Sequence, residues 1–329
     1  MEEPSKIRAL SLFSGGLDSM LAVCVLRDQG IEVHAITFES PFFSSATPRA
    51  SAAQLELPLI VKDFTHDITG LIESPPHGFG SGMNPCIDCH TRMFKRAGEY
   101  MKGNGFHFLC TGEVLNERPM SQNRRSLEVV AQGSGYPELI LRPLSALHLP
   151  ESKPEQLGWV DRTRLLNLEG RSRKRQMELA AHYGIKSYPT PAGGCLLTDP
   201  GYSKRLKELK SHEGLDLRLI SLLRTGRHFR LPGNIRVIAG RNQKDNELLA
   251  AAATPEDTIL KTVGIAGPVV MVLTSPDEQA IQTAAAICAR YSDLAPGQTC
   301  TVLATRQGIT QQLEHIGPAD RDKVPEWMI

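Results

Sequence analysis

The sequence predicts an α/β protein with a doubly wound parallel sheet, followed by a smaller α+β domain. Short β-branched or apolar runs alternate with longer helical patterns through the first half of the chain, and a double-glycine turn joins the first run to the first helix. Parallel strands need crossover helices, so this alternation places helices on both faces of one sheet. The alternation is lost after a charged connector near residues 200–216. Two domains, 1–212 and 213–329, are therefore expected, which suits a chain of 329 residues.

Each expected element follows from its residue pattern. Apolar, β-branched runs predict first-domain strands at Ile7–Phe13, Glu32–Phe38, Leu59–Asp63, Phe108–Thr111 and Leu139–Arg142. Helical periodicity predicts helices at Asp18–Arg27, Ser45–Leu55, Cys89–Gly103, Glu155–Leu166 and Lys174–His182. After a helical connector at Ser203–His212, strands are expected at Leu219–Arg230 (interrupted), Ile235–Gly240, Thr258–Val263, Val269–Leu273 and Thr299–Thr305, and a helix at Glu278–Tyr291.

The composition is that of a globular chain. Hydrophobic residues make up 41% and charged residues 22%, and the net charge is +1, so nucleic-acid binding would depend on local basic patches. The N-terminus lacks the apolar segment of a secretory signal, and the longest apolar run, Val263–Leu273, is broken by glycine and proline. We expect a cytoplasmic protein with no membrane partner, whose oligomeric state the sequence leaves open. In that reducing compartment its seven cysteines would be metal ligands, reactive thiols or core residues.

The turn Ser14-Gly15-Gly16-Leu17-Asp18-Ser19 is suited to binding a pyrophosphate group. Gly15 and Gly16 permit positive φ angles and let backbone N–H groups approach an anion. The helix N-terminus adds partial positive charge, and Ser14 and Ser19 add hydroxyl groups. Asp18 would repel phosphate unless a divalent cation lies between them, which makes it a candidate Mg²⁺ ligand. The alternative is an ordinary strand-helix turn with a Ser or Asp cap.

This turn resembles the PP-loop of the ATP pyrophosphatase superfamily, whose members cleave ATP between the α and β phosphates and adenylate a carbonyl oxygen. The segments Thr111–Leu115, Ser121-Gln122 and Leu141–Leu144 are similar to those of its 4-thiouridine synthetase branch. The resemblance implies an adenine nucleotide alpha hydrolase-like fold, with ATP and Mg²⁺ bound at the PP-loop.

Four further residues are expected to contact the nucleotide. Two end a predicted strand and two follow another at the edge where open α/β sheets hold ligands, and the last of the four is implied by the resemblance alone. They are Thr37, Phe38, Gly112 and Glu113.

Cys86 and Cys89 form a Cys-x-x-Cys pair that can share one metal centre. A redox dithiol does not match the thioredoxin position, and haem attachment to Cys-x-x-Cys-His is unexpected without an export signal. A structural zinc would need further ligands, with His77 and His90 as candidates. The remaining interpretation needs a third thiol, for which Cys195, in a glycine-containing turn, is the candidate.

The same resemblance extends to these three cysteines. In tRNA-thiolating members of the superfamily, a Cys-x-x-Cys pair and one distant cysteine meet over the nucleotide, which here implies Cys86, Cys89 and Cys195. In several branches they hold a 4Fe-4S cluster with one iron open for sulfur; in others two such cysteines work without metal, one as a persulfide. The third cysteine favours the cluster. Cys24, Cys110 and Cys288 fit core positions better.

Two basic segments are candidate RNA contacts. The first, Arg162–Arg175, includes Arg171, Arg173, Lys174 and Arg175. The second, Arg218–Lys244, contains seven basic residues and no acidic one. Arginine pairs bidentately with phosphate, whereas a solvated helix face or strand edge is the alternative.

The second segment resembles the RNA-binding NFACT-R domain, in which a Gly-Arg-Asn-x-x-x-Asn element opens a helix; here that element is Gly240–Asn246. The resemblance implies RNA contacts at Arg227, Arg230, Arg241 and Lys244.

Together these features predict an ATP-dependent enzyme that thiolates uridine in tRNA or another structured RNA. The uracil carbonyl oxygen would be adenylated and then replaced by sulfur from sulfide or a persulfide carrier, with Asp18, Cys86, Cys89 and Cys195 as the catalytic residues. Two alternatives stay open: an amidotransferase-like enzyme that adenylates a small molecule, and a non-enzymatic RNA-binding or iron-sulfur protein. The first leaves the three cysteines unexplained.

Overall fold

The computed structural model describes all residues except 1–5, 119, 191–193 and 274–275. It consists of two compact units, Met1–Thr198 and Asp199–Ile329, which are described separately here. The predicted domain boundary after residue 212 lies at the end of helix α8 (Pro200–His212), which falls within the second unit.

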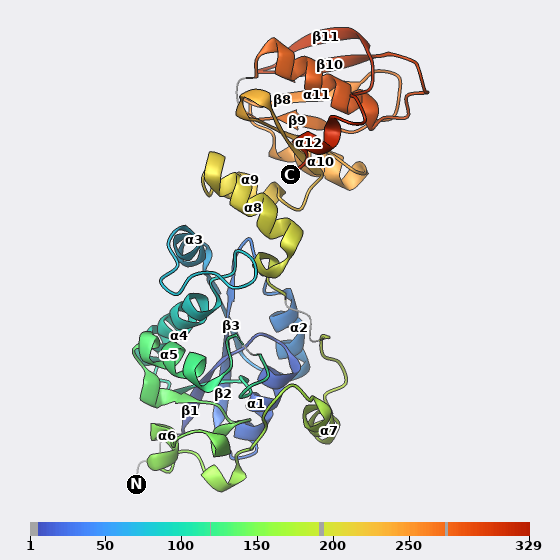
Figure 1. The fold of residues 1–329 in the computed structure, drawn as a ribbon. Coiled ribbons are helices and arrows are strands. Elements are labelled where there is room, and N and C mark those ends of the chain that lie inside the picture. Colours follow the sequence, from blue (N-terminus) through green and yellow to red (C-terminus); the bar gives the residue numbers. More distant parts are fainter. Residues whose placement is uncertain (1–5, 119, 191–193, 274–275) are drawn as a thin grey trace. The chain divides into compact units, whose positions relative to one another are not determined.

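The first unit is built on the predicted parallel sheet (Figure 1). Its strand order is β3-β2-β1-β4-β5, and every described pairing is parallel. The strands are β1 (Arg8–Leu12), β2 (Glu32–Glu39), β3 (Leu59–Asp63), β4 (Phe108–Thr111) and β5 (Ile140–Leu141). The α/β fold class predicted from the sequence is confirmed.

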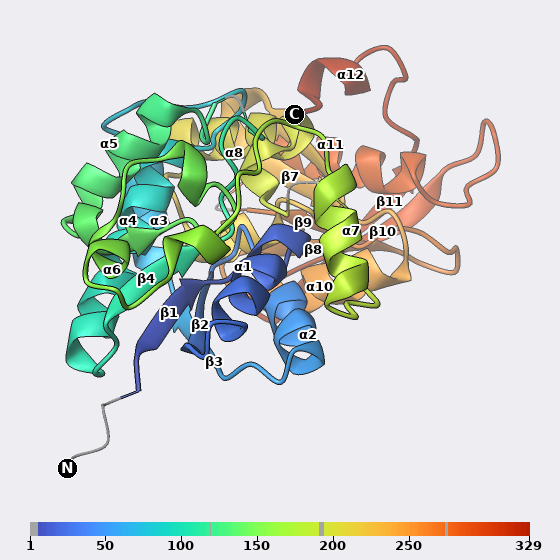
Figure 2. The same cartoon turned by 90° about the horizontal axis from the view of Figure 1, so that it is seen from below.

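Helices cover both faces of this sheet. They are α1 (Leu17–Arg27), α2 (Ala46–Gln54), α3 (Thr65–Glu73), α4 (Cys86–Gly103), α5 (Arg124–Ser134), α6 (Lys153–Gln156) and α7 (Lys174–His182). Figures 1 and 2 show α1, α2 and α7 on one face and α4 and α5 on the other. Helix α1 is apolar between Met20 and Leu26 and lies buried between the sheet and α7, with Leu17, Met20 and Leu26 almost fully enclosed.

One predicted helix is wrong. Within residues 155–166, only Glu155 and Gln156 are α-helical, as the end of the four-residue helix α6. A separate 3₁₀ turn follows at Arg162–Arg164. Gly158 has φ +68°, which ends the helix, and Asp161 caps the next turn by accepting from the Thr163 N–H at 2.9 Å. Helices α3 and α5 were not predicted. Asn123 caps α5 through its side chain, a local signal that periodicity alone does not detect.

The second unit is an antiparallel sheet with the strand order β11-β10-β8-β9-β7-β6. Its strands are β6 (Arg227–Leu231), β7 (Ile235–Ala239), β8 (Thr258–Thr262), β9 (Val270–Val272), β10 (Cys300–Arg306) and β11 (Ile309–Ile316). Its helices are α8, α9 (Leu217–Leu222), α10 (Gln243–Ala252), α11 (Glu278–Arg290) and α12 (Val324–Trp327). The small buried residues Ala284, Ala285 and Cys288 let α11 pack closely on the sheet.

The strand predicted over Leu219–Arg230 begins only at Arg227. Residues 217–222 instead form α9, because the Asp216 carboxylate accepts from the Leu219 N–H at 2.9 Å and starts a helix there. Strand β11 was not predicted; it pairs with β10 and presents mostly polar, exposed residues.

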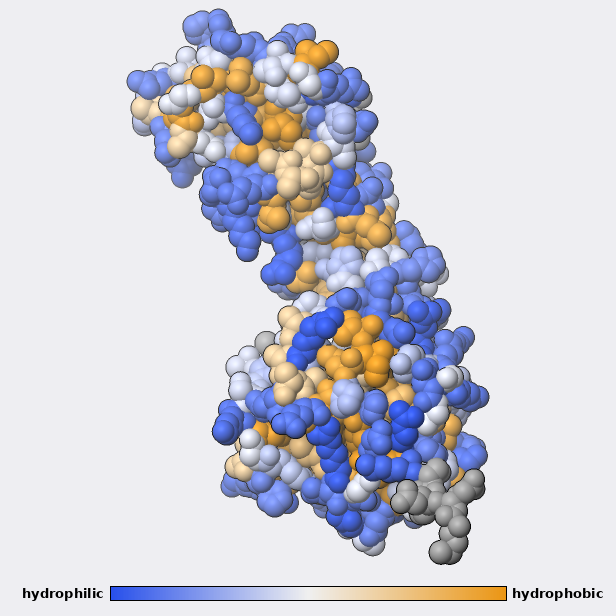
Figure 3. All heavy atoms as spheres, turned by 180° about the vertical axis from the view of Figure 1, so that it is seen from behind, coloured by the Kyte–Doolittle hydropathy of each residue, from blue (hydrophilic) through white to orange (hydrophobic). Residues whose placement is uncertain are grey.

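Hydrophilic and apolar residues alternate in small patches over the face of the molecule shown in Figure 3. Among the described residues, no helix combines the length and apolar character needed to cross a bilayer.

Candidate functional site

The candidate site of the first unit lies at the carboxyl edge of the parallel sheet. The PP-loop follows β1, and Gly112 follows the neighbouring strand β4. A crossover helix runs antiparallel to its strands, so the N-terminus of α4, with Cys86 and Cys89, lies at this edge too.

Gly15 adopts a backbone conformation that a side chain would oppose. Its φ is +73°, and a Cβ atom there would come within 2.8 Å of the backbone of Thr47 and Pro48. The Ser51 hydroxyl donates to the Gly15 carbonyl at 2.7 Å, so α2 holds the loop in place. Gly15 therefore has the glycine-dependent conformation that the sequence predicts, whereas Gly16 has a φ of −73°, not the positive φ that its glycine would permit.

The two serines of the loop lie together. The Ser19 hydroxyl donates to the Gly16 carbonyl at 2.8 Å, and the Ser14 and Ser19 oxygens are 3.4 Å apart. Gly16 precedes α1 with extended backbone geometry and no side-chain cap. The N-terminus of α1 thus keeps its positive partial charge for an anion.

Asp18 carries a buried oxygen without a partner. Its Oδ1 has no hydrogen-bond partner among the described residues. Burial raises the pKa of Asp18, and the positive charges of Arg173 and Arg118 act against that rise. An unpaired carboxylate oxygen next to a phosphate-binding loop is a suitable ligand for Mg²⁺.

Arg173 lies beside Asp18, where its charge acts on the carboxylate. It precedes α7, which packs on α1, and its Nε is buried without a described partner. Gln176, one helical turn later, also acts on Asp18, and its buried Oε1 lacks a described partner. Sequence reasoning assigned Arg173 to RNA and missed Gln176 and Arg118. The three-residue spacing of Arg173 and Gln176 places both on one face of a helix, and this was the signal in the sequence that they act at the same site.

Gly112 touches the PP-loop directly. A Cβ atom at this position would lie 2.4 Å from the Asp18 carbonyl carbon and 2.4 Å from the Ser19 nitrogen. Only glycine lets the end of β4 pack against the start of α1 at this distance.

Glu113 is part of a buried ion pair. The Arg142 Nε donates to its Oε2 at 2.9 Å, and His90 Nδ1 lies 3.5 Å from its Oε1. Burial alone would raise the pKa of Glu113, but Arg142 and His90 hold it below its ordinary value. Thr37 and Phe38 are also buried, and the Phe38 ring packs 5.3 Å from that of Phe64. These residues support the sheet edge.

Cys86, Cys89 and Cys195 lie near enough to one another for their charges to interact. Burial raises the pKa of the Cys195 thiol to about 11, and the nearby Cys86 adds to that rise. The pKa of Cys89 is raised further by burial, with contributions from Cys195 and Cys86. The Leu196 N–H donates to the Phe42 carbonyl at 3.0 Å, so the segment after Cys195 is attached to the loop that follows β2.

The two histidines considered as zinc ligands have other partners. His77 donates its backbone N–H to the buried Asp88 at 3.0 Å, and its Nδ1 lies 2.5 Å from the same carboxylate. His90 lies beside Glu113. Within the described residues, no group of three or more His, Cys, Asp or Glu side chains is placed to hold a metal ion.

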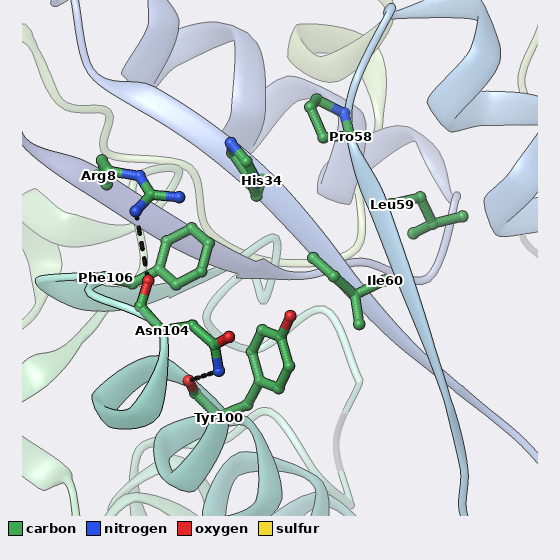
Figure 4. A pocket seen from close by; sticks show the side chains of 8 residues that line it. All are labelled: Arg8, His34, Pro58, Leu59, Ile60, Tyr100, Asn104 and Phe106. Carbon is green, nitrogen blue, oxygen red and sulfur yellow. Dashed lines mark hydrogen bonds between the residues drawn. The ribbon is translucent and has the colours of Figure 1, made fainter.

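A separate hollow of about 290 Å³ lies at the amino edge of the sheet, opposite the PP-loop (Figure 4). Arg8 stacks over the Phe106 ring at 4.4 Å, and both Arg8 and His34 pair with Glu32. Arg8, His34 and Asn104, which line this hollow, are therefore already partnered, and we assign it no role.

In the second unit, two arginines of the basic segment hold α8 against the sheet. Arg230 pairs with Glu213 at 2.5 Å and with Glu208 at 2.5 Å, and Arg236, whose side chain is 1% exposed, pairs with the same two carboxylates. Arg230, expected to contact RNA, is thus engaged in an internal ion-pair network.

His228 is buried beside this network. Its Nε2 lies 2.9 Å from the Thr225 carbonyl, and Arg236 Nη1 lies 3.3 Å from its Nδ1. Burial and the charge of Arg236 lower the pKa of His228 to about 3.

We predict that this histidine makes the second unit sensitive to acid. Folding lowers the pKa, so the folded protein keeps His228 neutral down to about pH 3, whereas the unfolded chain takes up a proton below about pH 6.5. The free energy of unfolding therefore falls by about 1.4 kcal/mol for each unit by which the pH drops between about 6.5 and 3. In His228→Gln the slope of unfolding free energy against pH should decrease by about one proton. Urea titrations at several pH values measure this; an unchanged slope would contradict the burial of a neutral imidazole.

The Gly240–Asn246 element is organised around Asp245. This carboxylate pairs with Arg241 at 2.7 Å and accepts the Gly226 N–H at 3.1 Å, while Asn242 caps α10 by accepting from the Asp245 N–H at 3.0 Å. A Cβ at Gly240 would lie 2.1 Å from the Asn246 side chain, which accepts from the Val269 N–H. These contacts within the second unit explain why Gly240, Asn242 and Asn246 stand at their positions in the element.

The other predicted RNA contacts differ in exposure. Arg227 stacks over the Tyr291 ring at 4.4 Å, and Lys244 is exposed. In the first unit, Arg171 and Lys174 are exposed, and Arg175 pairs with Glu178 at 2.9 Å on the surface.

Two parts of the chain match known families. Residues 5–151 match the family described as thiamine biosynthesis protein (ThiI), and residues 226–328 match the NFACT protein RNA binding domain. The first unit thus contains a segment similar to the ThiI family, and the second a segment similar to the NFACT RNA binding domain.

Curated relatives include two proteins named probable tRNA sulfurtransferase, from Thermoanaerobacter sp. (strain X514) and Thermoanaerobacter pseudethanolicus. Each is 30% identical over 153 residues, covering 44% of this chain and 38% of the relative. The chain thus spans less than half the length of these relatives.

Two solved structures are also similar. One is a 4-thiouridine synthetase-RNA complex with bound ATP, 20% identical over 65% of this chain and 52% of that chain, with a TM-score of 0.39. The other is the C-terminal part of the fibronectin/fibrinogen-binding protein of Streptococcus suis, 15% identical over 39% of this chain and 67% of that chain, with a TM-score of 0.28.

Proposed function

We propose that this chain, which joins a ThiI-type domain to an NFACT-type RNA-binding domain, is an ATP-dependent sulfurtransferase that thiolates uridine in cytoplasmic tRNA. The observation that supports the proposal most directly is that Cys86 and Cys89 begin α4 at the carboxyl sheet edge and that Cys195 is near enough for its charge to act on Cys89. The PP-loop lies at the same edge. One active site can therefore activate a base with ATP and supply it with sulfur.

The PP-loop would bind the β and γ phosphates of ATP. The backbone N–H groups at Gly15 and Gly16 and the N-terminus of α1 supply donors, and Arg173 and Arg118 supply positive charge beside Asp18. The unpartnered Asp18 Oδ1 fits a Mg²⁺ ion, which would neutralise phosphate charge when bound.

The chemistry proceeds in two displacements. The uracil carbonyl oxygen attacks the α-phosphorus, and the bond to pyrophosphate breaks, which converts a poor leaving group into AMP. Sulfide then attacks the ring carbon that bears the adenylated oxygen. A C–S bond forms, and the C–O bond to AMP breaks with loss of a proton. A sulfide donor requires no oxidant or reductant, whereas a persulfide donor ends as a disulfide that a thiol must reduce.

We also propose that the three cysteines hold a 4Fe-4S cluster. Three thiolates are the donor set of a cluster with one iron free of protein ligands, although the described residues are not already placed for metal binding. When bound, the cluster would supply a coordination position for the sulfur to be transferred. Iron analysis of anaerobically purified protein, compared with Cys86→Ala, tests this part separately.

Nucleoside analysis of tRNA tests the activity. A deletion strain should lack one thionucleoside, and the intact gene should restore it while Asp18→Asn should not. An amidotransferase acting on a small molecule, or a non-enzymatic RNA-binding protein, would leave tRNA thionucleosides unchanged in the deletion strain, and that result would refute the proposal.

A further inference from the structure

Ser51 lies on α2 and contacts the PP-loop through its side chain. Its hydroxyl donates to the Gly15 carbonyl at 2.7 Å, and both residues are buried. The two residues are 36 positions apart in the sequence, and α2 lies on the same face of the sheet as α1 (Figure 2). The turn at residues 14–19 is therefore held by a residue that its own sequence pattern does not contain.

Helix α2 packs closely against the loop at Gly15. A Cβ atom on Gly15 would come within 2.8 Å of the backbone of Thr47 and Pro48, and the hydrogen bond from Ser51 is itself buried. A buried carbonyl that loses its hydrogen-bond donor keeps the cost of its removal from water. Without the Ser51 hydroxyl, we therefore expect the peptide unit of Gly15 to turn toward another donor.

The Gly15 carbonyl and the Gly16 N–H belong to the same peptide unit. A trans peptide is planar and its C=O and N–H groups point in opposite directions, so Ser51 directs the Gly16 N–H away from α2. That N–H donates to the hydroxyl oxygen of the exposed residue Ser14 at 3.3 Å. Because this distance is longer than that of a typical N–H···O bond, a charged phosphate oxygen can replace the hydroxyl as the acceptor.

Gly16 is also held on its other side. Its carbonyl accepts from the Ser19 hydroxyl at 2.8 Å and from the Met20 N–H at 3.1 Å. Together with the Ser51 hydrogen bond, these contacts fix the peptide units before and after Gly16. A donor that is fixed before the ligand arrives binds it without a further cost of ordering.

We propose that Ser51 is a positioning residue for the β and γ phosphates of ATP, which acts by holding the Gly15 carbonyl so that the Gly16 N–H faces the phosphates. The proposal deepens the nucleotide-binding part of the proposed function and rests on it. A role in helix packing alone would not distinguish between ligands with and without these phosphates. A role in directing the Gly16 N–H predicts a loss of affinity only for ligands that carry them.

Calorimetric titration of the full chain with Mg-ATP, Mg-pyrophosphate and AMP tests this role. Ser51→Ala should bind ATP and pyrophosphate about 10-fold more weakly than the wild type, while its affinity for AMP stays within about 2-fold. Ser134→Ala is the matched control, because it also removes a buried hydroxyl that donates to a backbone carbonyl, that of Ala131 at 2.6 Å in α5. The control should bind all three ligands as the wild type does.

Wild-type affinity for ATP in Ser51→Ala, an equal loss of affinity for AMP, or the same loss in Ser134→Ala would each overturn the proposal. Ser51→Cys keeps a weak donor at this position and should show the same ligand pattern with a smaller loss, so the role can be tested even if Ser51→Ala does not fold. Because binding is measured without RNA or sulfur, a wild type that binds ATP but forms no thionucleoside refutes the activity and leaves the role of Ser51 standing.

Discussion

Gly112→Ala is expected to weaken ATP binding by at least about 100-fold and to abolish thiolation with it. The added Cβ would lie 2.4 Å from the Asp18 carbonyl carbon and 2.4 Å from the Ser19 nitrogen. Those are backbone atoms of the PP-loop and cannot move aside as a flexible side chain would. The loop or the end of β4 must shift, and the N–H groups that bind phosphate shift with it. Isothermal titration calorimetry with Mg-ATP measures the loss.

Gly103→Ala is the matched control. Gly103 ends α4, and a Cβ there meets nothing within 4 Å. This variant should bind ATP as the wild type does and gain up to about 1 kcal/mol of stability, since alanine favours the helix. Circular dichroism and tRNA binding show whether Gly112→Ala is still folded. Native ATP affinity in a folded Gly112→Ala protein would place the nucleotide elsewhere.

Cys195→Ser is expected to reduce thionucleoside formation by at least about 1,000-fold while ATP affinity stays within about 2-fold of the wild type. The serine oxygen keeps the size of the side chain but cannot carry transferable sulfur. The groups that act on the Cys195 thiol include Cys86 and none of the residues that act on Asp18. Single-turnover assays with tRNA, ATP and sulfide measure the product.

Cys24→Ala provides the comparison for this variant, because it removes a buried thiol from α1. It should lower stability by about 1 kcal/mol and leave thiolation intact. Thionucleoside formation by Cys195→Ser at the wild-type rate would exclude the three-cysteine centre. If the variant forms no product and the anaerobically purified wild type contains no iron, the thiols would still be required for thiolation and the cluster would be excluded.

Much of the fold was predictable because its signals are local. The five strands of the first unit are short apolar runs, and β1 and β4 are buried along almost their full length. The helix expected over 155–166 failed for an equally local reason, since Gly158 at φ +68° ends α6 and periodicity does not register such a stop. Helix α9 was mistaken for a strand because Leu219 and Ile220 suit either structure, and its Asp216 cap decided the outcome.

The number of basic residues in a segment predicted RNA contacts less well than the hydrophobic pattern predicted strands and helices. Seven basic residues lie in 218–244, yet Arg230 and Arg236 pair with Glu208 and Glu213, carboxylates of the α8 region that precede the segment in sequence. Arg173 likewise belongs to a basic run but acts on Asp18. A count of charges within a segment does not include partners supplied by another element.

The sequence by itself determined the turn at residues 14–19, because adjacent glycines after an apolar run constrain the backbone through sterics that act within a few residues. It also determined the strand-helix alternation of the first unit. Only the tertiary structure decided that Gly112 packs against the start of α1, that Ser51 binds the Gly15 carbonyl, and that Arg142 pairs with Glu113. These contacts join elements distant along the chain, and they arise from packing within the core of the first unit, which local residue patterns do not encode.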